Sequence, residues 1–128
     1  MNLNQVTVPA SDVAGSIAFY KKLDLSLIVE DLPKYARFQC PDGNSTFSIH
    51  RAGDIPEASA IVIYFECQDL DARVEALKES GVTFDSGPQD QPWLWREAHL
   101  SDPDGNHICL YNAGENRLNP PWRIQGHP

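Results

Sequence analysis

One structural pattern occurs twice in this sequence, and the repeat constrains the fold more than any other feature. Each copy has a β-rich segment, then an aspartate that precedes an amphipathic helix, then strands joined by a Pro-Asp-Gly-Asn turn. Asp12 precedes the first helix and Asp69 the second, 57 residues later. A sheet with one helix cannot bury both of its faces, so the two copies are predicted to pair around a cavity.

Alternation of apolar and polar residues predicts the elements of the first copy. Ser11 or Asp12 is the expected N-cap, because both side chains can accept a hydrogen bond from the first helical turn. Gly43 suits the backbone conformation with positive φ that the Asp-Gly turn requires. The predicted elements are the strand Gln5–Val8, the helix Val13–Leu23 and the strands Leu25–Val29, Tyr35–Gln39 and Thr46–His50.

The second copy is predicted in the same way. Gln68 and Asp69 are expected to cap its helix, and Gly81 is a stop signal at the helix end. The linker is predicted over residues 52–59, which gives modules at 1–51 and 60–113 and a C-terminal arm at 114–128. The predicted elements are the strand Ile61–Phe65, the helix Leu70–Ser80, the extended segment Val82–Phe84 and the strands Trp93–Leu100 and Ile108–Tyr111.

Composition excludes several classes of function. The formal net charge is −8 and no stretch of Lys or Arg forms a basic stripe, which argues against binding to nucleic acid. No apolar run approaches the length of about 20 residues that crosses a bilayer, and the N-terminus lacks the pattern of a signal peptide. Cys40, Cys67 and Cys109 form no Cys-x-x-Cys pair, so we expect free thiols and a cytoplasmic protein.

Three segments resemble one known family. They are VTVPASDVAGSIAFYKKL, DLDARVEALKESGVTF and DPDGNHICLY, within a similarity that covers roughly residues 3 to 113. They resemble the vicinal oxygen chelate superfamily, which includes glyoxalases, bleomycin-resistance proteins and extradiol dioxygenases. The resemblance implies an α+β protein in which two paired βαβββ modules form a cupped mixed sheet. It also implies a homodimer with a small-molecule ligand in the cup.

The resemblance also identifies four positions that hold a divalent metal in many members. They fall on Gln5, Ser48, Val62 and Cys109, where the usual residues are oxygen or nitrogen donors. Gln5 is an acceptable ligand, but Val62 cannot bind a metal and a thiol suits only soft ions. We therefore predict that the usual metal site is largely lost and that no cofactor is required. The alternatives are a divalent metal on Gln5 and His50 with Glu66, or on Glu97 with His99.

Period-two alternation predicts which side chains face the cup. Near the ends of their strands, His50 and Glu66 are candidate catalytic groups, although a surface position is the alternative for each. Trp93 and Trp95 lie two residues apart on a predicted strand, so their side chains are expected on the same face. They could stack against a planar ligand, belong to the core or form a dimer contact. Cys109 is expected as a small buried side chain and His107 as turn surface. The predicted ligand-binding residues are Gln5, Thr7, Ser48, His50, Tyr64, Glu66, Trp93, Trp95, Cys109 and Tyr111.

Three hypotheses for the function follow. The first is an enzyme of glyoxalase-like ancestry, a lyase, isomerase or dioxygenase relative with a changed metal site. The second is a binding protein that sequesters a small organic molecule without a metal, and aromatic side chains in an acidic chain suit a cationic, partly planar ligand. The third is a structural or regulatory protein that kept the fold.

The arm contains Trp122 after two prolines and is expected to pack on its own chain or to clasp a second subunit.

Overall fold

The computed structural model describes residues 1–55 and 60–124. Part of the predicted linker and the last four residues of the predicted arm therefore lie outside the described residues. The chain divides into two compact units, which we describe one at a time. The first unit contains residues 1–61 and 101–106, and the second contains residues 62–100 and 107–128.

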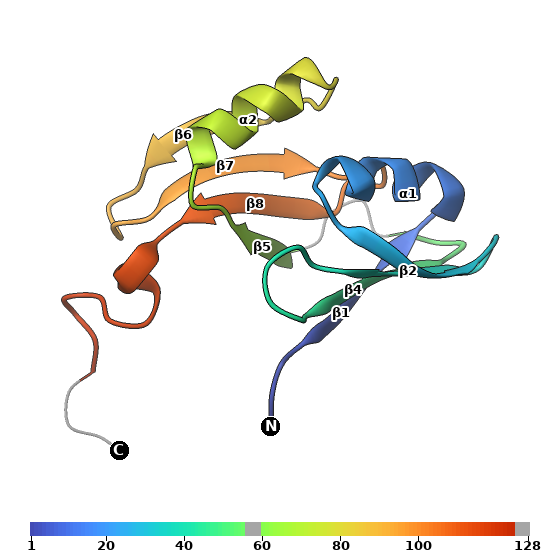
Figure 1. Cartoon of the computed structure of the whole chain (residues 1–128), viewed down its shortest axis with the longest axis horizontal. Helices are drawn as coiled ribbons and strands as arrows, with labels where there is room; N and C mark the ends of the chain where they lie inside the picture. Colours follow the sequence, from blue (N-terminus) through green and yellow to red (C-terminus); the bar gives the residue numbers. More distant parts are fainter. Residues whose placement is uncertain (56–59, 125–128) are drawn as a thin grey trace. The chain divides into compact units, whose positions relative to one another are not determined.

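The first unit is a four-stranded sheet with one helix, as the repeat predicts (Figure 1). Its strand order is β1-β4-β3-β2, in which β1 and β4 are parallel and the other neighbours antiparallel. The bounds are β1 Gln5–Ala10, α1 Val13–Lys22, β2 Ser26–Asp31, β3 Tyr35–Gln39 and β4 Thr46–Arg51. The predicted elements are thus confirmed, with ends that move by up to two residues.

Helix α1 begins where the sequence predicts. The Asp12 side chain accepts a hydrogen bond from the backbone N–H of Gly15 at 3.2 Å. The helix buries Val13, Ile17 and Tyr20 against the sheet. Burying an aliphatic side chain of this size stabilises a fold by about 1.5–3 kcal/mol, so this face is a main source of stability for the unit.

The turn between the last two strands of the second copy belongs to the first unit. The buried carboxylate of Asp102 accepts hydrogen bonds from the Tyr20 hydroxyl at 2.6 Å and from the Asn106 side-chain amide at 2.8 Å. It also accepts the backbone N–H groups of Asp104 and Asn106, each at 2.9 Å. Asp104 in turn accepts the Ser11 hydroxyl at 2.6 Å. Four donors compensate the desolvation of the Asp102 carboxylate, which therefore fastens the turn to α1.

Replacing Tyr20 by Phe tests this attachment. The substitution keeps the aromatic ring and removes one donor from the buried Asp102 carboxylate, so the free energy of unfolding should fall by about 1–3 kcal/mol. Urea denaturation followed by circular dichroism measures the change. The matched control is Tyr64→Phe on a half-exposed ring, which should change stability by no more than about 0.5 kcal/mol. Equal effects of the two substitutions would contradict the assignment.

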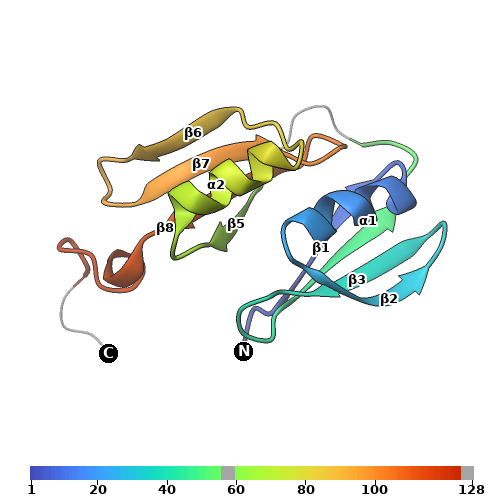
Figure 2. The ribbon, with the colours of Figure 1, turned by 45° about the horizontal axis from the view of Figure 1, so that its top comes forward.

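The second unit repeats the topology of the first (Figure 2). Its strand order is β5-β8-β7-β6, and β5 and β8 are parallel. Helix α2 buries Leu70, Val74 and Leu77, and Gly81 follows its end with a positive φ of 97°. The bounds are β5 Val62–Glu66, α2 Leu70–Glu79, β6 Ser86–Asp90, β7 Arg96–Ser101 and β8 His107–Asn112, followed by the 3-10 helix η1 at Gly114–Arg117.

Two sequence predictions about the second unit are wrong, and a third is confirmed in position only. Val82–Phe84 is not a strand; the strand is β6, Ser86–Asp90, and it contains Pro88. Proline is tolerated there because β6 is the edge of its sheet, and sequence pattern alone cannot place the edge. Trp93 and Trp95 lie in the turn before β7, where Leu94 has a φ of 69°. Asp69 occupies the N-cap position of α2, but its side chain makes no capping hydrogen bond.

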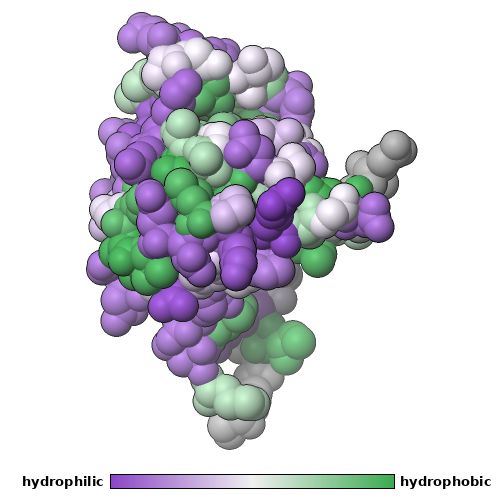
Figure 3. Space-filling view, turned by 90° about the vertical axis from the view of Figure 1, so that its right-hand side faces the viewer, coloured by the Kyte–Doolittle hydropathy of each residue, from purple (hydrophilic) through white to green (hydrophobic). Residues whose placement is uncertain are grey.

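The surface is mixed in character. Figure 3 shows one face on which hydrophobic patches interrupt a mostly hydrophilic surface. The exposed apolar side chains of the first unit include Ile28 and Val29 on the edge strand β2. Cys40, Cys67 and Cys109 form no disulfide with one another. Among the described residues, no helix has the length and apolar character needed to cross a bilayer.

Candidate functional site

The face of the first sheet opposite α1 carries a polar network. The Gln5 amide donates to the Ser48 hydroxyl at 2.9 Å and to the Thr7 hydroxyl at 3.1 Å, and the Thr46 hydroxyl donates to the Gln5 carbonyl oxygen. The Ser48 hydroxyl also lies 2.7 Å from the Tyr35 hydroxyl. The side chains of Gln5 and Ser48 therefore bind each other and their neighbours.

A positive charge lies beside this network. Arg37 Nε donates to the Tyr35 hydroxyl at 2.9 Å, and the guanidinium lies 5.5 Å from the Tyr35 ring centroid. Burial acts to raise the pKa of Tyr35, but hydrogen bonds from Ser48 and Arg37 outweigh it, so the net pKa lies below its ordinary value. A guanidinium next to Tyr35 and Ser48 disfavours a divalent cation at this place.

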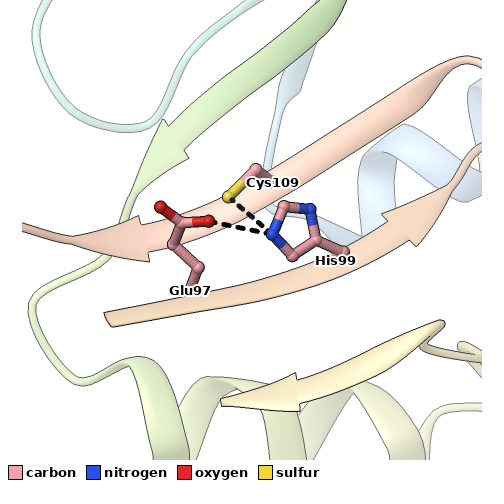
Figure 4. Close-up of side chains that lie close together, drawn as sticks. All are labelled: Glu97, His99 and Cys109. Carbon is pink, nitrogen blue, oxygen red and sulfur yellow. Dashed lines mark hydrogen bonds and ion pairs between the residues drawn. The ribbon is translucent and has the colours of Figure 1, made fainter. Parts of the chain in front are cut away.

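The second sheet brings together three donors of different chemistry. Glu97 and His99 extend from β7 and Cys109 from β8, and their side chains point toward one another (Figure 4). His99 Nε2 lies 2.9 Å from Glu97 Oε1 and 3.8 Å from Cys109 Sγ. Glu97 is 4 % exposed and Cys109 is fully buried. We call Glu97, His99 and Cys109 the donor group.

Two further side chains hold the donor group in place. His107 Nε2 lies 2.8 Å from Nδ1 of His99, the ring nitrogen that does not face Glu97. The Trp93 indole N–H donates to the second oxygen of Glu97, Oε2, at 2.6 Å. Both contacts leave Glu97 Oε1 and His99 Nε2 directed toward Cys109.

Burial, and after it the charge and hydrogen bond of the neighbouring Glu97 carboxylate, together raise the pKa of the Cys109 thiol to about 12. Near neutral pH Cys109 is therefore a protonated thiol and a poor nucleophile. The structure confirms the prediction from the sequence that the Cys109 side chain is buried.

Thiol reactivity provides a direct measurement. In metal-free native protein, Cys40 and Cys67 are half buried and should react with Ellman's reagent well before the buried Cys109. All three thiols should react rapidly after unfolding in guanidinium chloride. The variant Cys109→Ser should lose only the slow phase. Loss of a fast phase in that variant would show that Cys109 is accessible and would contradict the structure.

Aromatic rings lie next to the donor group. The Trp95 ring stacks on Tyr111 with centroids 4.6 Å apart, and Tyr64 contacts both rings edge-on at 5.9 and 5.6 Å. Tyr64 is 48 % exposed and Trp93 is 46 % exposed. The Trp95 indole N–H donates to the backbone carbonyl of Asn116 in the arm at 3.3 Å. We call Tyr64, Trp95 and Tyr111 the aromatic cluster.

The remaining candidates from the sequence lie elsewhere. His50 is exposed and pairs with Pro9, whereas Gln5 pairs with Thr46. A spacing of four residues along a strand is about 13 Å, so Gln5 and His50 form no shared metal site.

The Glu66 carboxylate accepts the backbone N–H groups of Ala113 and Gly114 at 3.0 and 3.2 Å. It holds the start of η1, and its catalytic role remains a sequence-based prediction.

Sequence reasoning did not assign site roles to several residues that the structure brings together. Glu97 and His99 entered only as an alternative, and Tyr35 and Arg37 did not enter as site residues. His107 was expected on the turn surface, but it is half buried and contacts His99. The available signal was the alternation Glu-x-His beside His-x-Cys on consecutive segments, which places all four side chains on one face when the strands pair.

A family profile gives the identity of the fold. The Glyoxalase/Bleomycin resistance protein/Dioxygenase superfamily matches residues 2–110. The chain belongs to this superfamily. The curated relative YraH, an uncharacterized protein of Bacillus subtilis (strain 168), is 27% identical over 128 residues, which cover 87% of this chain and 98% of YraH.

Solved structures of this superfamily show the same fold. A glyoxalase/bleomycin resistance protein/dioxygenase from Nocardioides has a TM-score of 0.79 at 19% identity and covers 98% of this chain and 90% of its own. A bleomycin-binding protein complexed with bleomycin has a TM-score of 0.71 at 24% identity and covers 88% of this chain and 98% of its own. The predicted α+β architecture of two βαβββ modules is confirmed.

The usual metal positions of the superfamily do not fit a metal in this member. In the first unit, Gln5 and Ser48 bind each other beside Arg37. In the second unit, Val62 is apolar and Cys109 is a buried thiol. Among the residues that the structure describes, only the donor group combines oxygen, nitrogen and sulfur atoms within reach of one ion, and two of its three members lie outside the usual positions.

Proposed function

We propose that this protein binds a small, partly planar organic molecule noncovalently through the aromatic cluster of the second unit. The observation that carries the proposal is the stack of Trp95 on Tyr111 with the half-exposed Tyr64 edge-on to both. Large aromatic rings offer much contact area with little loss of conformational entropy, which suits them to ligand binding.

Binding is favoured over the usual metal-assisted chemistry of the superfamily. That chemistry needs an ion with open positions that polarises substrate oxygens. Arg37, Tyr35 and Val62 disfavour an ion at the usual positions. The related bleomycin-binding protein, which was solved with bleomycin bound, supports the binding of an organic molecule by this fold.

The charge of the chain favours a cation. The formal net charge is −8, and the faces of Tyr and Trp rings attract cationic groups. An organic cation is therefore expected to bind more tightly than a neutral or anionic molecule of the same shape. We also propose that the protein is located in the cytoplasm.

A matched ligand series tests the proposal. One bicyclic aromatic scaffold carrying a trimethylammonium, a neutral or a sulfonate group is titrated into the full-length protein. The cationic form should quench tryptophan fluorescence and give the lowest Kd in calorimetry. Tyr64→Ala should weaken its binding by about fivefold or more, because a cation–π contact contributes about 1 kcal/mol.

The matched control is Trp122→Ala in the arm, which removes an exposed ring outside the aromatic cluster and should leave Kd unchanged. The proposal fails if none of the three ligands changes the fluorescence or produces heat. It also fails if Trp122→Ala weakens binding as much as Tyr64→Ala does.

The superfamily resemblance also leads us to propose a homodimer. Ile124 in the arm is 88 % exposed, which provides apolar surface for a contact. Size-exclusion chromatography with light scattering should give twice the chain mass of 14.3 kDa. A mass that stays at one chain across the concentration range would contradict the dimer.

A further inference from the structure

The donor group converges on a single atom. Glu97 Oε1 and Cys109 Sγ both approach Nε2 of His99, at 2.9 and 3.8 Å. The three donor atoms lie within 4.8 Å of one another (Figure 4). Two of the three residues are almost fully withdrawn from solvent. An oxygen, a nitrogen and a sulfur donor thus surround one small volume.

This geometry does not match a nucleophilic relay. In a Cys-His-carboxylate relay, the thiol and the carboxylate contact opposite nitrogens of the imidazole, so that a proton can pass from one side while the other side is held. Here both contact Nε2, and Nδ1 faces His107 instead.

The arrangement instead matches a first shell of metal ligands with supporting contacts. Metal-binding histidines commonly hydrogen-bond through their second ring nitrogen, and metal-binding carboxylates commonly hydrogen-bond through their second oxygen. His107 makes the first kind of contact, with Nδ1 of His99, and Trp93 makes the second kind, with Oε2 of Glu97. Both contacts leave His99 Nε2 and Glu97 Oε1 available for an ion.

We propose that Glu97, His99 and Cys109 bind one divalent cation that accepts sulfur, with Zn²⁺ as the preferred ion and Co²⁺ as its substitute. Tetrahedral Zn²⁺ with ordinary bond lengths separates such donors by about 3.4–3.6 Å. The observed separations of 2.9 and 3.8 Å lie on either side of that range, so small side-chain rotations complete the site. When the ion binds, Cys109 becomes a thiolate and its proton is released to solvent. A thiolate disfavours Mg²⁺ and Ca²⁺, which prefer oxygen ligands.

The proposed site differs from the usual metal site of the superfamily, with which it shares only the position of Cys109. Three protein ligands leave a fourth tetrahedral position for water or for an oxygen of a bound molecule. The proposal does not rest on the binding of an organic ligand, because the metal alone is the probe.

The test is a titration of metal-free, full-length protein with Co²⁺. We expect one equivalent to bind, with a thiolate-to-cobalt charge-transfer band that Zn²⁺ abolishes by displacement. Cys109→Ser should remove the band. His99→Gln and Glu97→Gln should weaken Zn²⁺ binding at least about tenfold, because loss of an outer-shell partner alone costs 10–100-fold. Cys67→Ser and His50→Gln are matched controls that should bind as the parent does.

Circular dichroism of each metal-free variant separates loss of the site from loss of the fold. If Cys109→Ser does not fold, His99→Gln decides the question, because the His99 side chain is 26% exposed and tolerates replacement. The proposal is overturned if the parent gives no charge-transfer band and retains no zinc in equilibrium dialysis. It is also overturned if the band survives in Cys109→Ser or disappears in Cys67→Ser.

Discussion

The buried carboxylate of Asp102 is the interaction on which the arrangement of the candidate site depends. Its oxygens accept hydrogen bonds from Tyr20, from two backbone N–H groups of its own turn and from the Asn106 amide. Tyr20 is fully buried and contacts the rings of Phe38 and Phe47. A charged group so placed is costly to bury unless each oxygen is paired, so the turn has one well-defined conformation.

That turn also sets the register of the strands on either side of it. The backbone N–H of Asp102 donates to the carbonyl of Asn106 at 3.0 Å, which closes the turn between β7 and β8. Counting outward along the two antiparallel strands from this pair places His99 opposite Cys109. A shift of one residue would turn Cys109 toward α2 and leave His99 without its thiol neighbour. The donor group is therefore a consequence of the turn.

The two copies share a topology but differ in the chemistry of their open sheet faces. In the first copy, Cys40 occupies the place that corresponds to Asp102, and its turn is exposed. The first face is a closed polar network with an arginine, from Gln5 through Ser48 and Tyr35 to Arg37. The second face carries aromatic rings and the donor group. The two copies therefore share a scaffold, and the side chains on their open faces differ.

The sequence by itself determined the architecture of this protein. Local signals predict this architecture: the Asp12 cap and the two Asp-Gly turns each depend on residues that are neighbours in the chain. The repeat is the occurrence of the same local signals a second time along the sequence. The tertiary structure alone decided that β6 is the strand with Pro88, that Trp93 lies in a turn, and that Glu97, His99, His107 and Cys109 share one face. These facts depend on strand order and register, which are set by backbone hydrogen bonds between segments that are distant in the chain, such as the pairing of β5 with β8.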